Sequence, residues 1–362
     1  MSEKINQVEP NISEQDIQRV SDYMSSGAWI TEHALTKELE EKIAHFVGRK
    51  YAIAVPNGTI AIYLSLLAAG LTEGKRVAVP NITMIATINA ILWAGAEPVI
   101  IDLNERLCMS IKSLQTVDKL DGVIYVPLNG RTEDGLAIEE YCKERNITLI
   151  EDSAHALGSQ YQDRMCGSLG SMSVFSFTPH KIITMGQGGL VLTDDDSLYE
   201  YLLDLKTFNR SKDKSDWHDG FGLNFKITDL QSALGLSQFE KINEFINIKK
   251  EMFQFFERSI KKYNFIDFFE YETPWFIDLI CESEQERDSA KAFLGDADIL
   301  TRESYPALSK QSFLQNVEKT NLEVSENISE HILWLPSSTN LTKDQMQEVV
   351  DKVTTFCATK EF

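Results

Sequence analysis

A lysine stands between two apolar runs in the stretch SFTPHKIITMGQGGLVLT, residues 176–193. Lys181 comes shortly after Pro179 and before three glycines, at positions 186, 188 and 189. Most lysines in such a loop are exposed to solvent, because the charged amine is almost never fully buried. In a tight apolar pocket, desolvation instead lowers the pKa of the amine and leaves a neutral nucleophile that can attack an aldehyde. Both roles are open for Lys181 on this evidence.

A carboxylate and an imidazole follow a second apolar run, ITLIED, at residues 147–152. Asp152 ends this predicted strand, where an unpaired buried carboxylate would be costly. Its ordinary role would be to cap the next helical turn, and its chemical role would be to face a cationic ring nitrogen. His155 lies three residues later on the same face of that turn. Its ring would either pack in the interior or stack on an aromatic cofactor.

A third feature is the segment YAIAVPNGTIAIY, residues 51–63. A strand, a turn at Gly58 and a helix that opens at Thr59 present free N–H groups and a hydroxyl to an anion. Many strand–turn–helix units look like this, so the segment alone is weak evidence for phosphate binding. A phosphate site, a carboxylate for a ring nitrogen and a lysine that forms a Schiff base are together what pyridoxal phosphate requires of a protein. The three features therefore predict a pyridoxal phosphate site.

These side chains follow the strands of one predicted sheet. Seven short runs rich in β-branched residues alternate with apolar helical segments, at 51–55, 76–80, 97–102, 122–127, 147–152, 173–177 and 188–193. Strands that are apolar on both faces and joined by helices indicate a mainly parallel sheet that helices cover on both sides. Ligands bind beyond the carboxyl ends of such strands. We therefore expect an α/β fold whose site lies at that edge of the sheet.

The pattern changes after about residue 240. A long charged helix is predicted over roughly 229–263, and the last predicted helix opens with a Thr342–Gln345 capping box. We expect a large cofactor-binding domain with an N-terminal arm in residues 1–240 and a smaller α+β domain in residues 241–362. We also expect several aromatic side chains of the second part to be exposed and to be covered in a homodimer, namely Phe253, Phe255, Phe256, Phe268 and Phe269.

Composition excludes several classes of protein. The net charge of −20 disfavours a nucleic-acid partner, whose phosphates require a basic surface. The five cysteines form no CxxC pair and the six histidines show no metal-ligand spacing, so we predict no disulfide framework and no metal site. No apolar stretch approaches eighteen residues and the chain opens without a secretory signal. These observations predict a cytoplasmic protein that does not enter a membrane.

The stretch EDSAHALGSQYQDRMCGSLGSMSVFSFTPHKIITMGQGGLVLTDD, residues 151–195, resembles the signature of the DegT/DnrJ/EryC1/StrS family of pyridoxal phosphate-dependent sugar aminotransferases. VPNGTIAIYLSLLAAGL, VPNITMIATINAILWAGAEPVIID and GLNFKITDLQSALGLSQFEKI are similar to three further family blocks in the same order. The resemblance is strong from about residue 28 to 245. It weakens beyond that point, although LTRESYPALSKQSF is still similar to a family substrate segment. It implies pyridoxal phosphate fold type I, with a mainly parallel seven-stranded sheet.

The resemblance also implies roles for individual residues. Lys181 would attach the cofactor as a Schiff base and transfer protons, Asp152 would pair with the ring nitrogen, and His155 would contact the ring. The other residues implied in cofactor binding are Gly58, Thr59, Met84, Ser176 and Asn224. Of these, Met84 takes a position that usually holds a stacking aromatic residue, and Asn224 would reach the site across a dimer interface. The residues implied in substrate binding are Trp29, Asn81, His180, Arg302 and Tyr305.

The activity implied by the resemblance is amination of a nucleotide-linked 4-keto-6-deoxyhexose at C4, with L-glutamate as donor and a homodimer with shared active sites. The product would be an amino-dideoxy sugar nucleotide for polysaccharide biosynthesis. One alternative within the family is amination at C3. A second is a dehydratase, disfavoured because that variant replaces the lysine with histidine and this chain keeps Lys181. A third is a catalytically silent sensor or scaffold, which would not need the lysine, the carboxylate and the phosphate site together.

Overall fold

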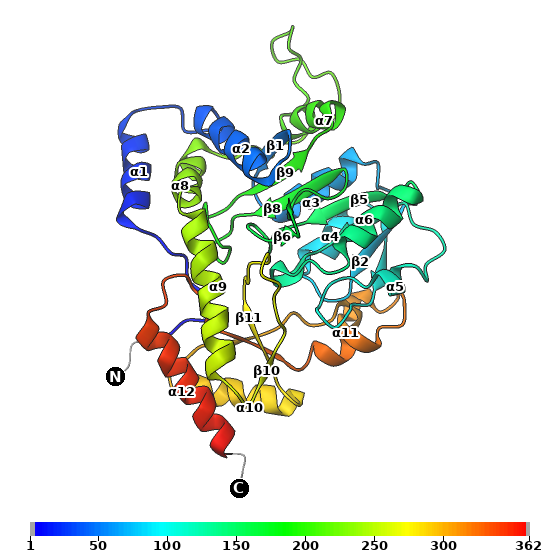
Figure 1. Cartoon of the computed structure of the whole chain (residues 1–362). Helices are drawn as coiled ribbons and strands as arrows, with labels where there is room; N and C mark the ends of the chain where they lie inside the picture. The colour runs from blue at the N-terminus through cyan, green and yellow to red at the C-terminus, as the bar shows by residue number, and fades with distance from the viewer. Residues whose placement is uncertain (1–3, 360–362) are drawn as a thin grey trace.

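An eight-stranded, mainly parallel sheet lies at the centre of the structure (Figure 1). The computed structural model describes residues 4–359. The order of the strands across the sheet is β1-β9-β8-β5-β4-β2-β3-β13. Seven of them are the predicted strands, namely β1 Tyr51–Val55, β2 Arg76–Pro80, β3 Glu97–Ile101, β4 Gly122–Tyr125, β5 Thr148–Asp152, β8 Met172–Ser176 and β9 Gly189–Thr193. The predicted α/β fold with a mainly parallel sheet is confirmed.

Strand β9 runs antiparallel to both of its neighbours, and this reversal brings two loops together. Its first residue, Gly189, pairs with Val55 at the end of β1 and with Ser176 at the end of β8. A Cβ atom at Gly189 would lie 2.5 Å from the carbonyl carbon of Asn57, so only glycine allows the two backbone segments to lie this close together. The Lys181 loop and the turn that opens the next helix therefore meet at one edge of the sheet.

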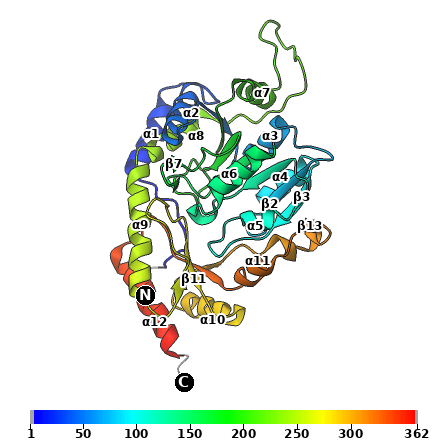
Figure 2. The same cartoon turned by 45° about the vertical axis from the view of Figure 1, so that its right-hand side comes forward.

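Helices cover both faces of the sheet, because consecutive strand residues point to opposite faces and those on both faces are apolar (Figures 1 and 2). Ile53 and Val55 of β1 pack toward one face, and Ala52 and Ala54 pack toward the other. The first face is covered by α3 Gly58–Ala68, α4 Ala86–Trp93 and α7 Asp196–Lys206. The second is covered by α2 Ala34–Val47, α5 Ile111–Leu114, α6 Gly135–Glu144 and α8 Asp229–Phe239. A short hairpin, β6 Gln160–Tyr161 and β7 Arg164–Met165, follows β5.

The single helix predicted over 229–263 is two helices, so that prediction is wrong. Helix α8 ends at Phe239, and α9 spans Ile242–Ser259. Lys241 between them leaves the helical conformation, with φ −99° and ψ 5°. Its amine donates to the Asp16 carboxylate at 2.6 Å on α1, which spans Glu14–Ser25. The break thus coincides with a tertiary contact to α1, and α9 then runs from the large sheet toward the second sheet (Figure 1).

The second sheet is small and antiparallel, with the order β10-β11-β14-β12. Its strands are β10 Asn264–Phe265, β11 Ile277–Ile280, β14 Ile332–Leu335 and β12 Arg302–Glu303. Helices α9, α10 Glu284–Gly295 and α12 Lys343–Thr359 pack against it, and the predicted capping box at Thr342 is present. The predicted exposure of the phenylalanines is wrong: Phe253 and Phe256 are buried in this core, and Phe255 and Phe268 pack against it. Of the five, only Phe269 is exposed, at 38%.

Residues 302–322 contact both sheets. They begin in β12 and continue to β13, Glu318–Lys319, which pairs with β3 at the edge of the large sheet (Figure 2). Leu308, Leu314 and Leu322 lie in the core of the large sheet, and α11 Glu323–Ile328 follows them. At the other end of the chain, Ile5 forms a bridge with Ile299. The division into residues 1–240 and 241–362 stays a prediction.

A buried ion pair joins the loop after β4 to the small sheet. The Arg131 guanidinium lies 2.7 Å from the Asp278 carboxylate, and both side chains are fully buried. Asn129 donates to both oxygens of Asp278 at 2.8 and 3.0 Å, and the indole N–H of Trp334 donates to one of them at 2.6 Å. These donors compensate for the loss of water around the carboxylate.

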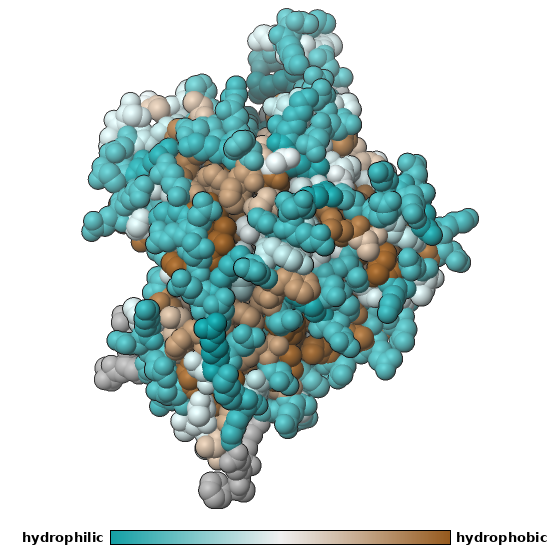
Figure 3. Space-filling model, in the orientation of Figure 1, coloured by the Kyte–Doolittle hydropathy of each residue, from teal (hydrophilic) through white to brown (hydrophobic). Residues whose placement is uncertain are grey.

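Hydrophilic residues cover most of the face shown in Figure 3. Hydrophobic residues reach this face in patches near its centre. None of the helices between residues 4 and 359 is both long and apolar enough to cross a bilayer.

Candidate active site

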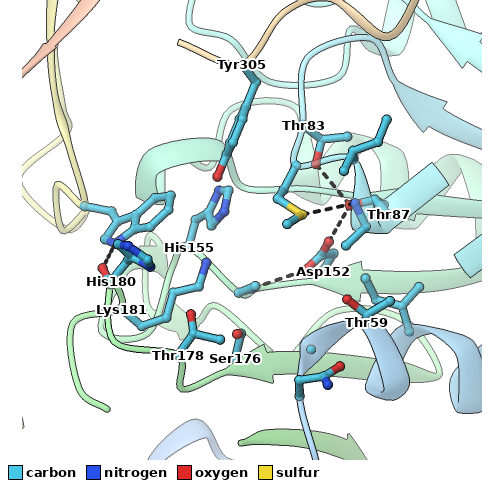
Figure 4. A pocket seen from close by; sticks show the side chains of 18 of the residues that line it. Thr59, Thr83, Thr87, Asp152, His155, Ser176, Thr178, His180, Lys181 and Tyr305 are labelled. Atoms are coloured by element: carbon cyan, nitrogen blue, oxygen red, sulfur yellow. Dashed lines mark hydrogen bonds between the residues drawn. The ribbon is translucent and has the colours of Figure 1, made fainter. Parts of the chain in front are cut away.

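A cavity of about 490 Å³ opens beyond the carboxyl ends of the parallel strands (Figure 4). Its walls come from the start of α3, the loop after β2, the ends of β5 and β8, and residues near β11 and β12. Most of the predicted site residues line it together, namely Gly58, Thr59, Met84, Asp152, His155, Ser176, His180, Lys181, Arg302 and Tyr305. The expectation that the strand ends would gather these side chains agrees with the structure.

Lys181 extends from the loop after β8 into this cavity, and its amine points toward His155 (Figure 4). The loop turns back at this point, because the Lys181 backbone N–H donates to the carbonyl of Thr178 at 3.0 Å. Burial lowers the pKa of the Lys181 amine to about 7; the Arg302 charge acts in the same direction and the Asp152 charge opposes it. An amine with this pKa exists in both protonation states near neutral pH, as proton transfer requires.

Asp152 ends β5 as a buried carboxylate at the cavity wall. The Thr87 hydroxyl donates to Oδ2 at 2.8 Å, and the backbone N–H of Ala154 donates to Oδ1 at 3.3 Å. Burial raises the pKa of the Asp152 carboxyl, while these two donors and the Lys181 charge act against that rise. A cationic ring nitrogen beside Asp152 would supply the charge that a buried carboxylate needs.

His155 is buried between two aromatic rings from elsewhere in the chain. Its ring stacks on Trp275 with centroids 4.0 Å apart and lies 5.8 Å from the Tyr305 ring. Burial, together with the Lys181 and Arg302 charges, holds the pKa of His155 well below its usual range, so the imidazole is neutral. Its Nδ1 atom is buried and has no hydrogen-bond partner among the described residues. This atom is free to bond to a ligand.

The start of α3 provides an anion site beside Ser176. Asn57 caps the helix by accepting the N–H of Ile60 at 3.0 Å. A Cβ atom at Gly58 would lie 3.0 Å from the Ser176 Cβ atom, so glycine permits the helix terminus to approach β8 closely. Gly58, Thr59 and Ser176 line the cavity, and Figure 4 shows the side chains of Thr59 and Ser176 near the start of α3. The first N–H groups of a helix have no partner within it, so this end of α3 can donate to an anion. A phosphate monoester fits this combination of donors.

Three predicted residues do not line the cavity. Asn81 is fully buried behind it, donating to Ser325 at 2.8 Å and accepting from the backbone of Ser309 at 2.9 Å. Trp29 lies before α2 and is 68% exposed. Asn224 is exposed and forms a bridge with Thr207 at the base of a long loop. Their proposed roles in binding stay predictions.

Sequence reasoning missed two residues with direct contacts in the site. Thr87, which holds Asp152, lies four residues after Thr83, and the two hydroxyls are 3.1 Å apart. Two threonines four residues apart near the start of a helix lie on one face of it, and this spacing predicts that their hydroxyls act together. Trp275 comes from the segment before β11 and contacts His155, His180 and Lys181. No local pattern connects it to residues about a hundred positions earlier.

A model of the DegT/DnrJ/EryC1/StrS aminotransferase family matches residues 10–354. The chain belongs to this family. The predicted family and the predicted aminotransferase class of enzyme are thereby confirmed. The amine, carboxylate, imidazole and anion site described above are therefore the candidate active site of an aminotransferase.

The similar proteins include two bacterial enzymes and one solved structure. The chain is 32% identical to a GDP-perosamine synthase of Escherichia coli O157:H7, over 97% of this chain and 98% of that one. It is 30% identical to a GDP-perosamine synthase of Vibrio cholerae, over 94% and 96%. The structure is similar to the crystal structure of the aminotransferase TlmJ from Streptoalloteichus hindustanus, with a TM-score of 0.93 and 25% sequence identity. The match covers 99% of this chain and 100% of that chain. The aminotransferase fold is thus shared along the whole chain.

Thr87→Val will lower the activity of this aminotransferase by about 10- to 100-fold, because a hydrogen bond to a charged group contributes roughly 1.5–3 kcal/mol. The Thr87 hydroxyl favours the ionised form of Asp152, so its loss raises the pKa of that carboxyl further. The acidic limb of the pH–rate profile will therefore move to higher pH. Thr116→Val, at an exposed position, is the control and will leave the profile unchanged. An unshifted profile for Thr87→Val would contradict this role.

Proposed function

We propose that the protein is a pyridoxal phosphate-dependent aminotransferase that aminates a nucleotide-linked 4-keto-6-deoxyhexose at C4, with L-glutamate as the amino donor. The observation that carries this proposal is the Lys181 amine, with its pKa lowered to about 7, in one cavity with Asp152 and the start of α3. Two relatives that the chain matches over nearly its whole length are named GDP-perosamine synthase. Their name supports amination at C4 and favours GDP as the nucleotide.

The residues in the cavity fit the groups of pyridoxal phosphate. The start of α3, Thr59 and Ser176 would hold the phosphate, Asp152 would keep the ring nitrogen protonated, and the free Nδ1 of His155 would bond to the ring hydroxyl. When bound, the cofactor supplies a ring that withdraws electrons from the substrate carbon that loses a proton. The Nζ atom of Lys181 accepts that proton and returns it, since its pKa of about 7 permits both steps.

Arg302 supplies a cation at the substrate end of the cavity. It lies on β12 with its guanidinium 5.6 Å from the ring centre of Tyr305 and 5.5 Å from that of Trp334. A planar guanidinium suits bidentate recognition of a carboxylate or a phosphate. The net charge of −20 is screened beyond a Debye length of about 8 Å, so the Arg302 guanidinium can still attract an anionic group to its part of the cavity. We therefore assign Arg302 to the anionic group of the donor or of the nucleotide.

A turnover assay tests the proposed function. Purified protein is incubated with pyridoxal phosphate, L-glutamate and keto sugars linked to GDP, UDP or dTDP, and NMR determines the position of the new amine. We expect one 2-oxoglutarate for each amino sugar, the amine at C4, and the fastest turnover with a GDP-linked substrate. Amination at C3 or loss of a hydroxyl group would support the alternative enzymes. A protein that stays colourless with pyridoxal phosphate and leaves glutamate unchanged would support a silent scaffold.

Asp152→Asn will bind pyridoxal phosphate but will lose at least about 100-fold in turnover, equivalent to roughly 2.7 kcal/mol. The neutral amide keeps the size of the side chain and cannot hold a ring nitrogen in its protonated form. Turnover at saturating substrate and cofactor content by absorbance separate the two effects. Asp118→Asn, a carboxylate outside the cavity, is the control. A rate near that of the wild type would remove Asp152 from the mechanism.

We also propose a homodimer in which Asn224 acts in the partner's site. Asn224 does not line the cavity of its own chain, and it closes the base of a loop that extends away from the body in both views (Figures 1 and 2). Its neighbour Phe225 lies 6.4 Å from Trp93, whose side chain is 53% exposed. A second copy covering this apolar group would support the exchange of Asn224 between subunits.

Co-expression of Lys181→Ala and Asn224→Ala chains tests the shared site. Each homodimer will be impaired, because one lacks the lysine and the other lacks the asparagine. In a heterodimer one site receives Lys181 from one chain and Asn224 from the other. Random pairing will therefore restore about a quarter of the sites, as two-fold symmetry requires. Activity no higher than the mean of the two homodimers, or a monomer in sedimentation, would contradict the proposal.

A further inference from the structure

Trp275 forms a wall of the cavity on the side of the small sheet. The Lys181 amine lies 4.2 Å from the centre of the Trp275 ring, within the range of a cation–π contact. The Trp275 ring also stacks on His155, with centroids 4.0 Å apart, and its indole N–H donates to the His180 carbonyl at 2.7 Å. One side chain thus contacts the lysine, the residue before it and the imidazole at the centre of the cavity.

The backbone of Trp275 is fixed on both sides. Its N–H donates to the carbonyl of Asn129 at 3.0 Å, and its carbonyl accepts from the Lys249 amine at 2.6 Å. Asn129 takes a left-handed conformation, with φ 56°, and its side chain is held by Asp278. Lys249 is buried on α9 and also donates to the carbonyl of Ser337. These contacts hold the indole in a defined position relative to the Lys181 loop.

We propose that Trp275 is a positioning residue for Lys181: its ring shields and supports the amine, its indole N–H fixes the backbone at His180, and Lys249 holds Trp275 itself. The proposal rests on the proposed function, in which Lys181 transfers protons; Trp275 then helps to hold that lysine in position, in addition to the loop after β8. Trp275 lies outside the large sheet that carries Lys181. The position of the amine therefore depends on contacts between the two sheets.

The ring controls how much water reaches the amine. Burial is the largest cause of the lowered pKa of Lys181, so removal of the indole will raise that pKa toward its usual value. The lost cation–π contact acts in the opposite direction and is the smaller effect, since a smaller side chain opens the cavity to solvent. The other charged or titratable groups that face the amine stay in place, namely Asp152, His155, His180, Arg302 and Tyr305.

The test measures the ionisation of Lys181 directly in full-length, cofactor-free protein. Trace labelling with acetic anhydride at a series of pH values, followed by mass spectrometry of the Lys181 peptide, gives the pKa of the amine. We expect Trp275→Leu to raise the labelling midpoint by about one pH unit or more. Lys249→Met will shift it in the same direction by less, because it removes the hydrogen bonds to the Trp275 and Ser337 carbonyls and leaves the indole ring in place. The control is Lys250→Met, whose amine bonds to the Glu270 carbonyl and does not contact Trp275.

The labelling midpoints distinguish a positioning role of Trp275 from a general loss of stability in the variants. An unshifted midpoint in folded Trp275→Leu protein, as judged by circular dichroism, overturns the proposal. If that variant does not fold, Lys249→Met decides: a midpoint equal to that of Lys250→Met overturns the proposal, and a higher one supports it. Because the labelling needs neither cofactor nor substrate, its result is independent of whether the proposed sugar is turned over.

Discussion

Replacing Lys181 with alanine will abolish sugar amination, with a fall in turnover of at least about 10⁴-fold, the upper range for one positioned proton-transfer group. The amine is the group in the cavity whose pKa of about 7 suits both acceptance and return of a proton. The variant will fold normally, since Lys181 lines a cavity and no core cluster contains it. Turnover is measured with the substrate found in the panel, and folding by circular dichroism.

A second measurement distinguishes loss of the lysine from loss of the cofactor. Reduction with borohydride followed by peptide mass spectrometry will place pyridoxal phosphate on Lys181 in the wild type and on no peptide in Lys181→Ala. Lys143→Ala, at an exposed position on α6 outside the cavity, is the matched control and will retain both the label and full activity. Covalent cofactor together with turnover in Lys181→Ala would falsify the assignment of this lysine.

Arg131→Met will lower the free energy of unfolding by about 3–5 kcal/mol, the usual cost of leaving one partner of a buried ion pair. Arg131 and Asp278 are both fully buried, so the remaining carboxylate would have no compensating cation beside it. The hydrogen bonds from Asn129 and Trp334 would remain and would offset only part of this cost. Urea unfolding followed by fluorescence measures the effect.

Two further variants establish the cause. Arg145→Met removes an exposed pair with Glu144, whose side chain is 61% exposed, and will change the free energy of unfolding by no more than about 0.5 kcal/mol. Asp278→Asn combined with Arg131→Met removes the unpaired charge and will recover a substantial part of the loss. If the free energy of unfolding of the single Arg131→Met variant is within about 1 kcal/mol of the wild-type value, the ion pair does not stabilise the contact between the loop after β4 and the small sheet.

The sequence predicts the large sheet well, and it places Asp152 and Lys181 at one edge of that sheet, because both inferences depend on local patterns. Seven strands are apolar on both faces, as buried parallel strands must be, and turn residues separate them from the helices. Asp152 and Lys181 follow two of these strands directly. Once the strands are assigned, the topology brings the two side chains to one edge. The resemblance to a family adds roles for residues that are already grouped by the fold.

The features that were missed depend on contacts between distant segments. Lys241 looks like any residue of a charged helix, and its contact with Asp16 of α1 at the break joins segments far apart in the sequence. The phenylalanines of α9 were predicted to be exposed, yet the small sheet covers them. Trp275 enters the site through the packing of that same sheet. Periodicity within one segment contains no information about which distant segment will cover it.

Strand β13 lies late in the chain, so the large sheet is completed only near the end of synthesis. Glu318 pairs with Val99 and Lys319 with Ile100, so β3 is an open edge of the large sheet until these late residues arrive. Residue 240 and those before it emerge from the ribosome well before β13 does, and the unpaired N–H and C=O groups of β3 then face solvent. A nascent chain that stalls at this stage is expected to pair through β3 with a neighbouring copy and to aggregate. The completed chain protects the same edge with a segment from its own C-terminal part.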